Sequence, residues 1–436
     1  GVSSRRSRAA TAPRQLPRAT PLPPATGPSP ADPHQLPSAT HPAPAAQRHN
    51  GWEPAAAARE SPIFCGGFGR KSGPLRHNGW DAVIFRGRIG LVIRLFIDCD
   101  PGIDDAIALG YALCQSDVEI TGIAASAGNV PVDAVTRNAL AWLELTGRTD
   151  IPVHRGAENP VAHRAGDPAP IFADDTHGPL GAGHAVLDEP TTTTHQLSAA
   201  EAWVQTARAH PGEVVGVVLG PHTNLALALR LEPELPTLLK RLFIMGGAFN
   251  YRGNTHPTTE WNITWDPEAA AEVFAAFGAP GTPLPVIGPI EATEAVVMTP
   301  QLLGQITSSS SAAPGWRQYL GQLAEALRFY FEFHEWDGHG YLAQIHDPYV
   351  TAAAIGWARA QATDSLPAAE QEIIPWAHTA DAAVDVELTG TLTRGETVAD
   401  WLGRWNRQPN ATLIRSLDAS QFLTHLAETL MRGPDQ

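Results

Sequence analysis

From residue 91 onward, short apolar runs alternate with segments whose apolar residues recur at helical spacing, and this alternation most constrains the fold. The apolar runs predict buried strands at 91–97, 118–125, 214–219 and 242–245. The segments between them predict helices at 104–114, 132–147, 224–231 and 267–277. Such alternation implies right-handed βαβ units. We therefore expect an α/β fold, with an open, mostly parallel, Rossmann-like sheet flanked by helices and an active site at the carboxyl ends of the strands.

The first ninety residues have a different composition. They hold 14 of the 39 prolines, and 12 Lys and Arg residues against 4 Asp and Glu. Without apolar periodicity such a segment cannot offset its chain entropy, so we expect residues 1–88 to be a disordered, Pro/Arg/Ala-rich tail and residues 89–436 to be the folded domain. The segment contains no apolar stretch typical of a secretory signal, and we expect a cytoplasmic protein. Because the first methionine is Met245, we hypothesise that initiation uses a valine codon such as Val83 or Val92.

Charge and cysteine usage exclude several functional classes. Residues 91–436 hold 18 Lys and Arg against 41 Asp and Glu, which argues against nucleic-acid binding but is compatible with a metal cation. No run of about 18 apolar residues is present, so we expect no membrane span. Cys65, Cys99 and Cys114 lack CxxC spacing, which argues against a zinc cluster or a disulfide scaffold.

Four carboxylates lie close together where the first predicted strand meets the first predicted helix: Asp98, Asp100, Asp104 and Asp105. Crowded carboxylates repel one another and lose hydration, and a hard divalent cation resolves both problems. Capping of the helix N-terminus explains Asp104 or Asp105, but not two aspartates at a strand end. The pattern therefore predicts a metal or catalytic centre.

Polar residues also follow the other predicted strands. In chain order they are Gly128-Asn129, Gly220-Pro221-His222-Thr223-Asn224, Gly246-Gly247, Gly253-Asn254, Glu260-Trp261-Asn262 and His346-Asp347. Because the carboxyl ends of parallel strands meet at one edge of the sheet, we expect these side chains to converge there. A mixture of amides and carboxylates suits a ligand with several hydroxyl groups.

The stretch Asp98-Cys99-Asp100-Pro101-Gly102-Ile103-Asp104-Asp105-Ala106 resembles the signature of the calcium-dependent, inosine-uridine-preferring nucleoside hydrolases. The resemblance covers essentially residues 92–430. Further motifs match in the family's order, and they are Gly128-Asn129-Val130, His177-Gly178, Leu219-Gly220-Pro221, Thr223-Asn224-Leu225-Ala226, Met245-Gly246-Gly247, Glu260-Trp261-Asn262, His346-Asp347-Pro348 and Thr393-Arg394-Gly395. The resemblance implies hydrolysis of the N-glycosidic bond of ribonucleosides to ribose and free base, by a homodimer or homotetramer that acts in nucleoside salvage.

The resemblance also implies roles for individual residues. It assigns Ca²⁺ to Asp100, Asp105, the backbone carbonyl of Thr223 and Asp347, with Asp98 near or within the same ligand set. Asp100 would take the proton of a Ca²⁺-bound water. The ribose would be held at its 2′- and 3′-hydroxyls by Asp104 and Asn262, at its 5′-hydroxyl by Asn254 and Glu260, and along its pocket by Asn129 and Met245.

The remaining assignments concern the base. Trp261 stands where many relatives carry Phe, and its larger ring would narrow or restack the region that holds the base. His177 is a further candidate for substrate contact. His346 stands where some members keep the acid that protonates the leaving base, and we expect the neighbouring carboxylate to favour its charged form. The aromatic, histidine-rich stretch 329–341 corresponds to the helix and loop that close over the base, where its aromatics can stack on it.

Two other classes of protein stay open at this point. An Asp-x-Asp pair after a first strand also opens the Mg²⁺-dependent haloacid-dehalogenase-like phosphatases, although Pro101-Gly102 do not fit their motif. A non-catalytic nucleoside-binding protein would keep the ribose contacts and lose a metal ligand, whereas all four candidate ligands are present. Base release from inosine and uridine, compared with phosphate release from a phosphomonoester, with and without EDTA, separates the three classes.

Overall fold

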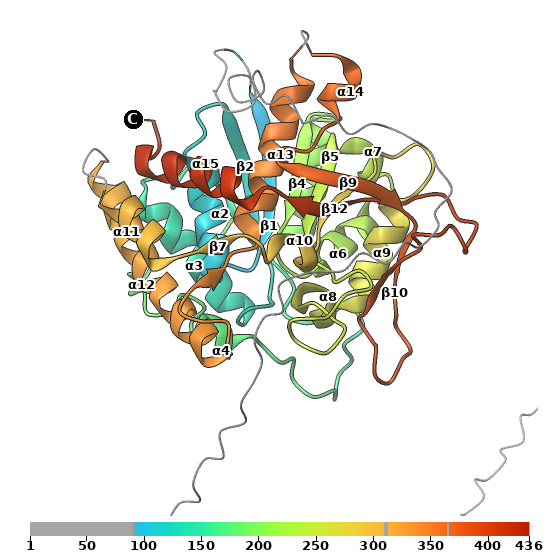
Figure 1. Cartoon of the computed structure of the whole chain (residues 1–436), viewed down its shortest axis with the longest axis horizontal. Coiled ribbons are helices and arrows are strands. Elements are labelled where there is room, and N and C mark those ends of the chain that lie inside the picture. The colour runs from blue at the N-terminus through green and yellow to red at the C-terminus, as the bar shows by residue number, and fades with distance from the viewer. Residues whose placement is uncertain (1–89, 91, 309–312, 364–365, 436) are drawn as a thin grey trace, which may run out of the picture. The chain divides into compact units, whose positions relative to one another are not determined.

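In the part of the chain that the structure describes, eight strands form one central sheet in the order β3-β2-β1-β4-β5-β6-β12-β9 (Figure 1). All neighbouring pairs are parallel except β12 and β9. The computed structural model describes residues 90, 92–308, 313–363 and 366–435. The sheet strands are β1 Ile93–Cys99, β2 Val118–Ala125, β3 Val153–Arg155, β4 Val214–Val218, β5 Arg241–Met245, β6 Val286–Gly288, β9 Ala377–Ala382 and β12 Ala411–Leu417. Two small antiparallel pairs join β7 Val297–Met298 to β8 Ala343–Gln344 and β10 Val384–Val386 to β11 Thr397–Ala399.

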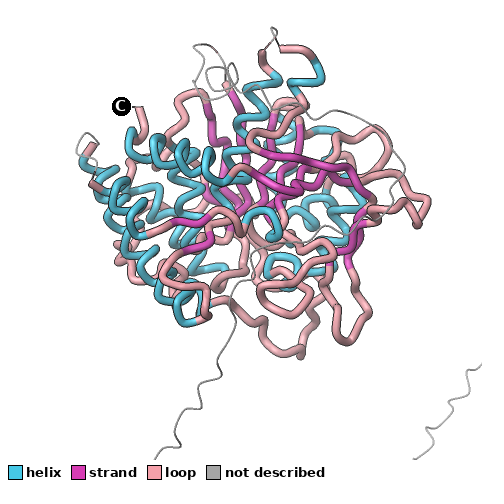
Figure 2. Tube along the Cα trace, viewed as in Figure 1, coloured by secondary structure: helices cyan, strands magenta, loops and turns pink. Residues whose placement is uncertain are grey.

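Helices cover both faces of this sheet, as Figure 2 shows. The helices are α2 Ile103–Leu113, α3 Val132–Leu145, α4 Asp174–His177, α5 Ala199–Ala209, α6 Thr223–Leu231, α7 Leu235–Leu238, α8 Trp261–Trp265, α9 Pro267–Phe277, α10 Ile290–Thr293, α11 Pro300–Thr307, α12 Pro314–Trp336, α13 Asp347–Gln361, α14 Ala368–Gln371 and α15 Ala419–Arg432. One hydrophobic core packs α2, α3, α11, α12, α13 and α15 on one face, and a second packs α5, α6 and α9 on the other.

The central strands supply side chains to both cores, which explains their apolar sequences. In β1, Leu95 and Ile97 belong to the first core and Phe96 to the second. Strand β4 alternates in the same way, because Val215 and Val217 face the first core and Val218 the second. A strand that is buried on both faces reads as a continuous apolar run, so the prediction of an open, mostly parallel sheet is confirmed.

The first strand extends two residues beyond its predicted end. The prediction ends this strand at Ile97, the last residue of the apolar run, yet β1 continues through Asp98 and Cys99. The Asp98 side chain is fully buried and accepts hydrogen bonds from Ser126 Oγ, Trp203 Nε1 and Asn224 Nδ2. These donors replace the water that a buried carboxylate loses, so a strand can contain it.

The tail expected over residues 1–88 lies outside the described residues, and so does its boundary with the folded domain. The motif Thr393-Arg394-Gly395 falls in the connection between β10 and β11. None of the described helices is long and apolar enough to cross a membrane.

A buried ion pair anchors the far end of α13, whose first residue, Asp347, lies at the candidate site. Arg359 donates through Nε to Asp117 Oδ2 at 2.8 Å and through Nη2 to Gln115 Oε1 at 2.9 Å. The side chains of Arg359 and Asp117 are both 2% exposed. Arg359 lies twelve positions after Asp347 along this helix, or about 18 Å.

Replacing Arg359 with methionine should lower the free energy of unfolding by about 3–5 kcal/mol, because it leaves the Asp117 charge buried without its partner. Urea denaturation measures this loss. The double variant Arg359→Met/Asp117→Leu should recover most of the stability, since it removes both charges. A single-variant loss below about 1 kcal/mol would contradict a stabilising role for the pair.

Candidate active site

A cavity of about 390 Å³ opens at the carboxyl ends of the central strands. Its lining residues follow five consecutive strands of the sheet, because Asp100 follows β1, Asn129 follows β2, Leu219 follows β4, Met245 ends β5 and Ile290 follows β6. Chain segments that are distant in sequence meet here because parallel strands end at one edge. The expected location of the site is therefore confirmed.

Asp100 sits in a position that only glycine neighbours permit. Its Oδ2 accepts a hydrogen bond from the Asn129 backbone N–H at 2.8 Å. A Cβ atom at Gly128 would lie 2.2 Å from Oδ2, and one at Gly220 would lie 2.6 Å from Oδ1. The two glycines noted in the motifs thus make room for the carboxylate between the ends of β2 and β4.

Asp104, Asp105 and Asp347 form a buried carboxylate cluster whose ligand atoms lie within 4.8 Å of one another. Asp105, in the first turn of α2, also binds the start of this helix, because its Oδ2 accepts from the N–H of the N-cap residue Gly102 at 2.9 Å and its Oδ1 from the Asp100 N–H at 3.2 Å. The cluster has the chemistry of a site for a hard divalent cation.

Burial is the main reason why these carboxyl groups resist ionisation. It raises the pKa of Asp100, Asp105 and Asp347 well above the usual range, and repulsion among neighbouring aspartates raises it further. A cation would reverse both effects, because it compensates the buried negative charge. The donor set therefore fits the metal that the sequence predicted.

The structure places two of the predicted metal ligands elsewhere. Asp98 is absent from the cavity lining, and both of its oxygens are used by Ser126, Asn224 and Trp203. Burial raises its pKa to about 6. Asp98 thus braces β1 against its neighbours rather than facing the cavity.

Thr223 is likewise absent from the cavity lining. It is the first residue of α6, so its carbonyl points along the helix, away from the N-terminal end. Leu219 lines the cavity instead, and its carbonyl oxygen accepts from Asn262 Nδ2 at 2.7 Å. Sequence reasoning missed Leu219 because every residue carries a backbone carbonyl, and side-chain identity gives no signal for it.

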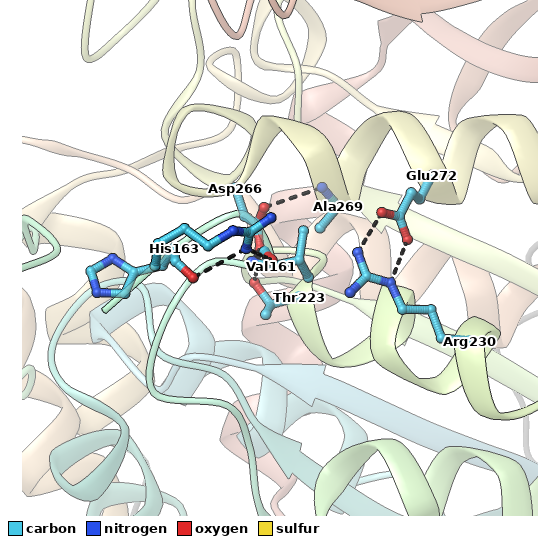
Figure 3. A network of polar contacts seen from close by, with 8 residues as sticks. Val161, His163, Thr223, Arg230, Asp266, Ala269 and Glu272 are labelled. Atoms are coloured by element: carbon cyan, nitrogen blue, oxygen red, sulfur yellow. Dashed lines mark hydrogen bonds and ion pairs between the residues drawn. The ribbon is translucent and has the colours of Figure 1, made fainter. Parts of the chain in front are cut away.

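The Thr223 hydroxyl belongs to a buried network centred on Asp266 (Figure 3). Asp266 Oδ2 accepts from Thr223 Oγ1 at 2.6 Å and from the Val161 N–H at 2.8 Å, while Oδ1 accepts from the Ala269 N–H at 3.1 Å. The network joins the starts of α6 and α9 to the loop that leads to the cavity wall at Phe172. The network therefore holds these elements together next to the cavity without lining it.

The residues expected to bind the substrate all line the cavity, namely Asp104, Asn129, Met245, Asn254, Glu260, Trp261, Asn262 and His177. Asn262 donates its amide N–H to Leu219 and Met245, which leaves its Oδ1 for a ligand hydroxyl. Asn254 uses its Oδ1 to accept from the Trp261 N–H, which leaves its Nδ2 as a donor. Glu260 caps α8 by accepting from the N–H groups of Asn262 and Ile263.

His346 and His177 lie in the same cavity and are both neutral at pH 7. Burial lowers the pKa of each histidine to about 4, and repulsion from His334 lowers both pKa values further. The expectation that a carboxylate keeps His346 charged is therefore wrong, because loss of hydration outweighs the attraction. His346 Nδ1 bonds Thr293 Oγ1 at 2.8 Å, and His177 Nδ1 accepts from the Ile103 N–H at 3.1 Å.

Helix α12 forms the opposite wall of the cavity with Tyr330, Phe333 and His334. Phe329 and Phe333 also pack against the first hydrophobic core, and Tyr330 and Phe331 are buried in it, so packing accounts for four of the six Phe, Tyr and Trp residues of the stretch. His334 engages both ring nitrogens, with the Tyr330 carbonyl and with the Gln344 N–H. Trp336 is 82% exposed and lies outside the cavity lining.

Comparison with known proteins identifies the family. The model of the inosine-uridine preferring nucleoside hydrolases matches residues 95–424. This chain belongs to that family. The pyrimidine-specific ribonucleoside hydrolase RihA of Enterobacter sp. (strain 638) is 35% identical over 343 residues, which is 78% of this chain and 98% of the relative. The RihA of Citrobacter koseri is 35% identical over 341 residues, with the same coverage.

Solved structures agree with this family. A plant nucleoside hydrolase superposes with a TM-score of 0.67 at 29% identity, covering 78% of this chain and 99% of its own. An inosine-guanosine nucleoside hydrolase superposes with a TM-score of 0.65 at 27% identity, covering 79% and 100%. The nucleoside hydrolase family thus confirms the prediction of an N-ribosyl hydrolase of nucleoside metabolism.

Proposed function

We propose that this nucleoside hydrolase cleaves ribonucleosides to ribose and free base in the cavity described above, with Ca²⁺ held by Asp100, Asp105, Asp347 and the Leu219 carbonyl. The observation that carries the proposal is the meeting of buried carboxylates with raised pKa values at one end of a cavity rich in hydrogen-bonding groups. Hard oxygen donors from three separate segments suit Ca²⁺. When bound, the cation would compensate these charges and lower the pKa of a water molecule beside it.

Side chains of the protein accept the proton, bind the ribose and surround the base. Asp100 accepts the proton of the attacking water, and Asn129 holds the carboxylate in place for this through its backbone N–H. Asp104 and Asn262 Oδ1 accept from the 2′- and 3′-hydroxyls, while Asn254 Nδ2 and Glu260 hold the 5′-hydroxyl. The rings of Trp261, Tyr330 and Phe333 surround the base. Base release from inosine and uridine, measured against phosphate release from a phosphomonoester, tests the reaction.

The assigned ribose contacts predict strong discrimination against 2′-deoxynucleosides. Without the hydroxyl, a buried acceptor is left unpaired at a cost of about 1–3 kcal/mol, or on the order of 10–100-fold in kcat/KM. Steady-state rates for inosine and 2′-deoxyinosine measure this ratio. The variant Asp104→Ala should narrow the ratio, since it removes the unpaired acceptor. Equal rates for both substrates in the wild type would contradict the role of Asp104.

His346 is proposed to assist the leaving base, and its removal should affect purines more than pyrimidines. Because the His346 ring is neutral at pH 7, it offers N7 of hypoxanthine a hydrogen bond from Nε2–H while Nδ1 pairs with the Thr293 hydroxyl, whereas a pyrimidine offers no N7. We expect His346→Ala to slow inosine cleavage by about 10²-fold, and uridine cleavage by less. Equal losses would instead make His346 a support for Asp347. The variant Thr293→Val, which removes the partner of Nδ1, is the control for ring orientation.

The finer partner and location predictions rest on the same proposal. We propose a small-molecule ribonucleoside as the substrate, a homodimer or homotetramer as the assembly, and the cytoplasm as the location. Sedimentation velocity tests the assembly.

A further inference from the structure

One cation lines an otherwise acidic cavity. Arg252 is the single Lys or Arg among the described residues of the lining, and its side chain is 53% exposed. The acidic residues of the same lining are Asp100, Asp104, Asp175, Glu260, Glu294, Asp337 and Asp347. None of the roles proposed above uses Arg252.

Glu294 holds this cation in place. Arg252 Nη2 donates to Glu294 Oε2 at 2.7 Å, and the Tyr251 hydroxyl donates to Oε1 at 2.8 Å. Both carboxylate oxygens of Glu294 are thus engaged, and the side chain is only 20% exposed. Glu294 follows α10, which is itself fixed, because the Ile290 N–H donates to the Gly247 carbonyl at 3.0 Å.

The ion pair lies beside the residues assigned to the 5′ end of the sugar. Arg252 is two residues before Asn254, in a tight turn where the Gly253 N–H donates to the Pro257 carbonyl and the Asn254 N–H to the Thr259 carbonyl. A Cβ atom at Gly253 would lie 2.1 Å from the His256 carbonyl oxygen, so the turn has little freedom. Asn254, Glu260, Arg252 and Glu294 all line the same cavity.

We propose that the Arg252–Glu294 ion pair determines specificity at the 5′ position, admitting an uncharged hydroxyl and rejecting a phosphate. A 5′-phosphate carries a charge of about −1.5 to −2 at pH 7 and needs a free cation. Glu294 already neutralises Arg252, and its own charge repels the phosphate. Without that charge, the Arg252 guanidinium is free to bind phosphate through paired N–H donors. This inference rests on the proposed function, because it uses the position assigned to the 5′-hydroxyl.

The test compares kcat/KM for uridine and for uridine 5′-monophosphate at fixed free Ca²⁺, in the wild type and in Glu294→Gln. Glutamine keeps the size and one acceptor oxygen but loses the charge. The preference for the nucleoside should fall by about tenfold or more, which corresponds to ~1.4 kcal/mol. Glu294→Gln thus gains relative kcat/KM toward the nucleotide, and added salt should reduce this gain, since it screens the phosphate–guanidinium attraction. An unchanged preference in a folded Glu294→Gln variant overturns the proposal.

Two matched variants isolate the contribution of Arg252. The double variant Arg252→Met/Glu294→Gln should lose the gain, because it has no cation to offer, and a gain that persists there overturns the proposal. The single variant Arg252→Gln leaves Glu294 charged and unpaired, so it should reject the nucleotide more strongly than the wild type. This opposite shift keeps the idea falsifiable even if Glu294→Gln unfolds.

A binding measurement separates this inference from the proposed function. Ribose and ribose 5-phosphate are compared by titration calorimetry with the same variants, and Glu294→Gln should shift the affinity ratio toward the phosphate. If the wild type cleaves neither inosine nor uridine, the proposed function fails, while the calorimetric ratio still tests the ion pair. If the wild type cleaves uridine and neither ratio shifts in Glu294→Gln, only the role of the ion pair fails.

Discussion

Replacing Asp100 with asparagine is expected to lower kcat for inosine and uridine by about 10³-fold or more. Asparagine matches aspartate in size and can still accept from the Asn129 N–H, so the cavity should keep its shape. It cannot take a proton from water, and general-base catalysis by one group contributes on the order of 10²–10⁴-fold. It also removes one charge from the proposed cation site. Steady-state release of free base, together with thermal unfolding to verify the fold, measures the effect.

Asp98 offers a matched control two residues away. Asp98→Asn changes the same atoms, but on a side chain held by Ser126, Trp203 and Asn224 outside the cavity. Asp98→Asn should lower the free energy of unfolding, and it should change kcat far less than Asp100→Asn does. If Asp100→Asn keeps near wild-type turnover, or if Asp98→Asn loses as much turnover as Asp100→Asn in a folded protein, the assignment of the general base is wrong.

Chelation is expected to abolish turnover and to make the protein's stability strongly dependent on pH. In the metal-free protein, burial raises the pKa of Asp105 to about 7, and those of Asp100 and Asp347 are raised as well. Unfolded aspartates have pKa values near 3.9, so the folded state binds more protons between these limits. The favourable contribution of the protonated forms is complete below about pH 4 and is lost as the pH rises through about 7.

Bound Ca²⁺ should remove this loss, because the cation favours the ionised carboxylates. Thermal unfolding in EDTA and in excess Ca²⁺ across pH 5–8 gives the test, and the stabilisation by Ca²⁺ should grow with pH. At a hundredfold excess over its Kd the cation adds about 2.7 kcal/mol. Mg²⁺ at the same concentration is the control for metal identity. Full turnover in EDTA, or a Ca²⁺ effect that shrinks as the pH rises, would contradict the proposed site.

Much of the architecture was predictable because local pattern and long-range packing agree. The runs at Val118–Ala125 and Pro267–Phe277 form a strand and a helix with the predicted bounds. The spacing of their apolar residues matches the faces that these two elements bury, so the pattern alone predicts where each begins and ends. Strand β1 departed from its predicted end because Asp98 finds three donors, two of them on α5 and α6.

Some features of the candidate site were predictable from the sequence, and others depend on the tertiary structure. The sequence by itself determined the family, the sheet edge that carries the site, and most of its side chains, because motif residues directly after buried parallel strands must meet at one edge. Only the tertiary structure decided which of the candidate residues line the cavity. Leu219 lines it and Thr223 and Asp98 do not.

The charge states and the Arg252–Glu294 pair were also decided by tertiary structure alone. Arg252 and Glu294 are 42 residues apart, and no local pattern relates them. The neutral state of His346 depends on how much water surrounds its ring, which is set by the elements packed around it. Sequence spacing brings groups to a strand end, whereas hydration, turn geometry and long-range partners determine what each group does there, because they depend on distances that only the folded chain defines.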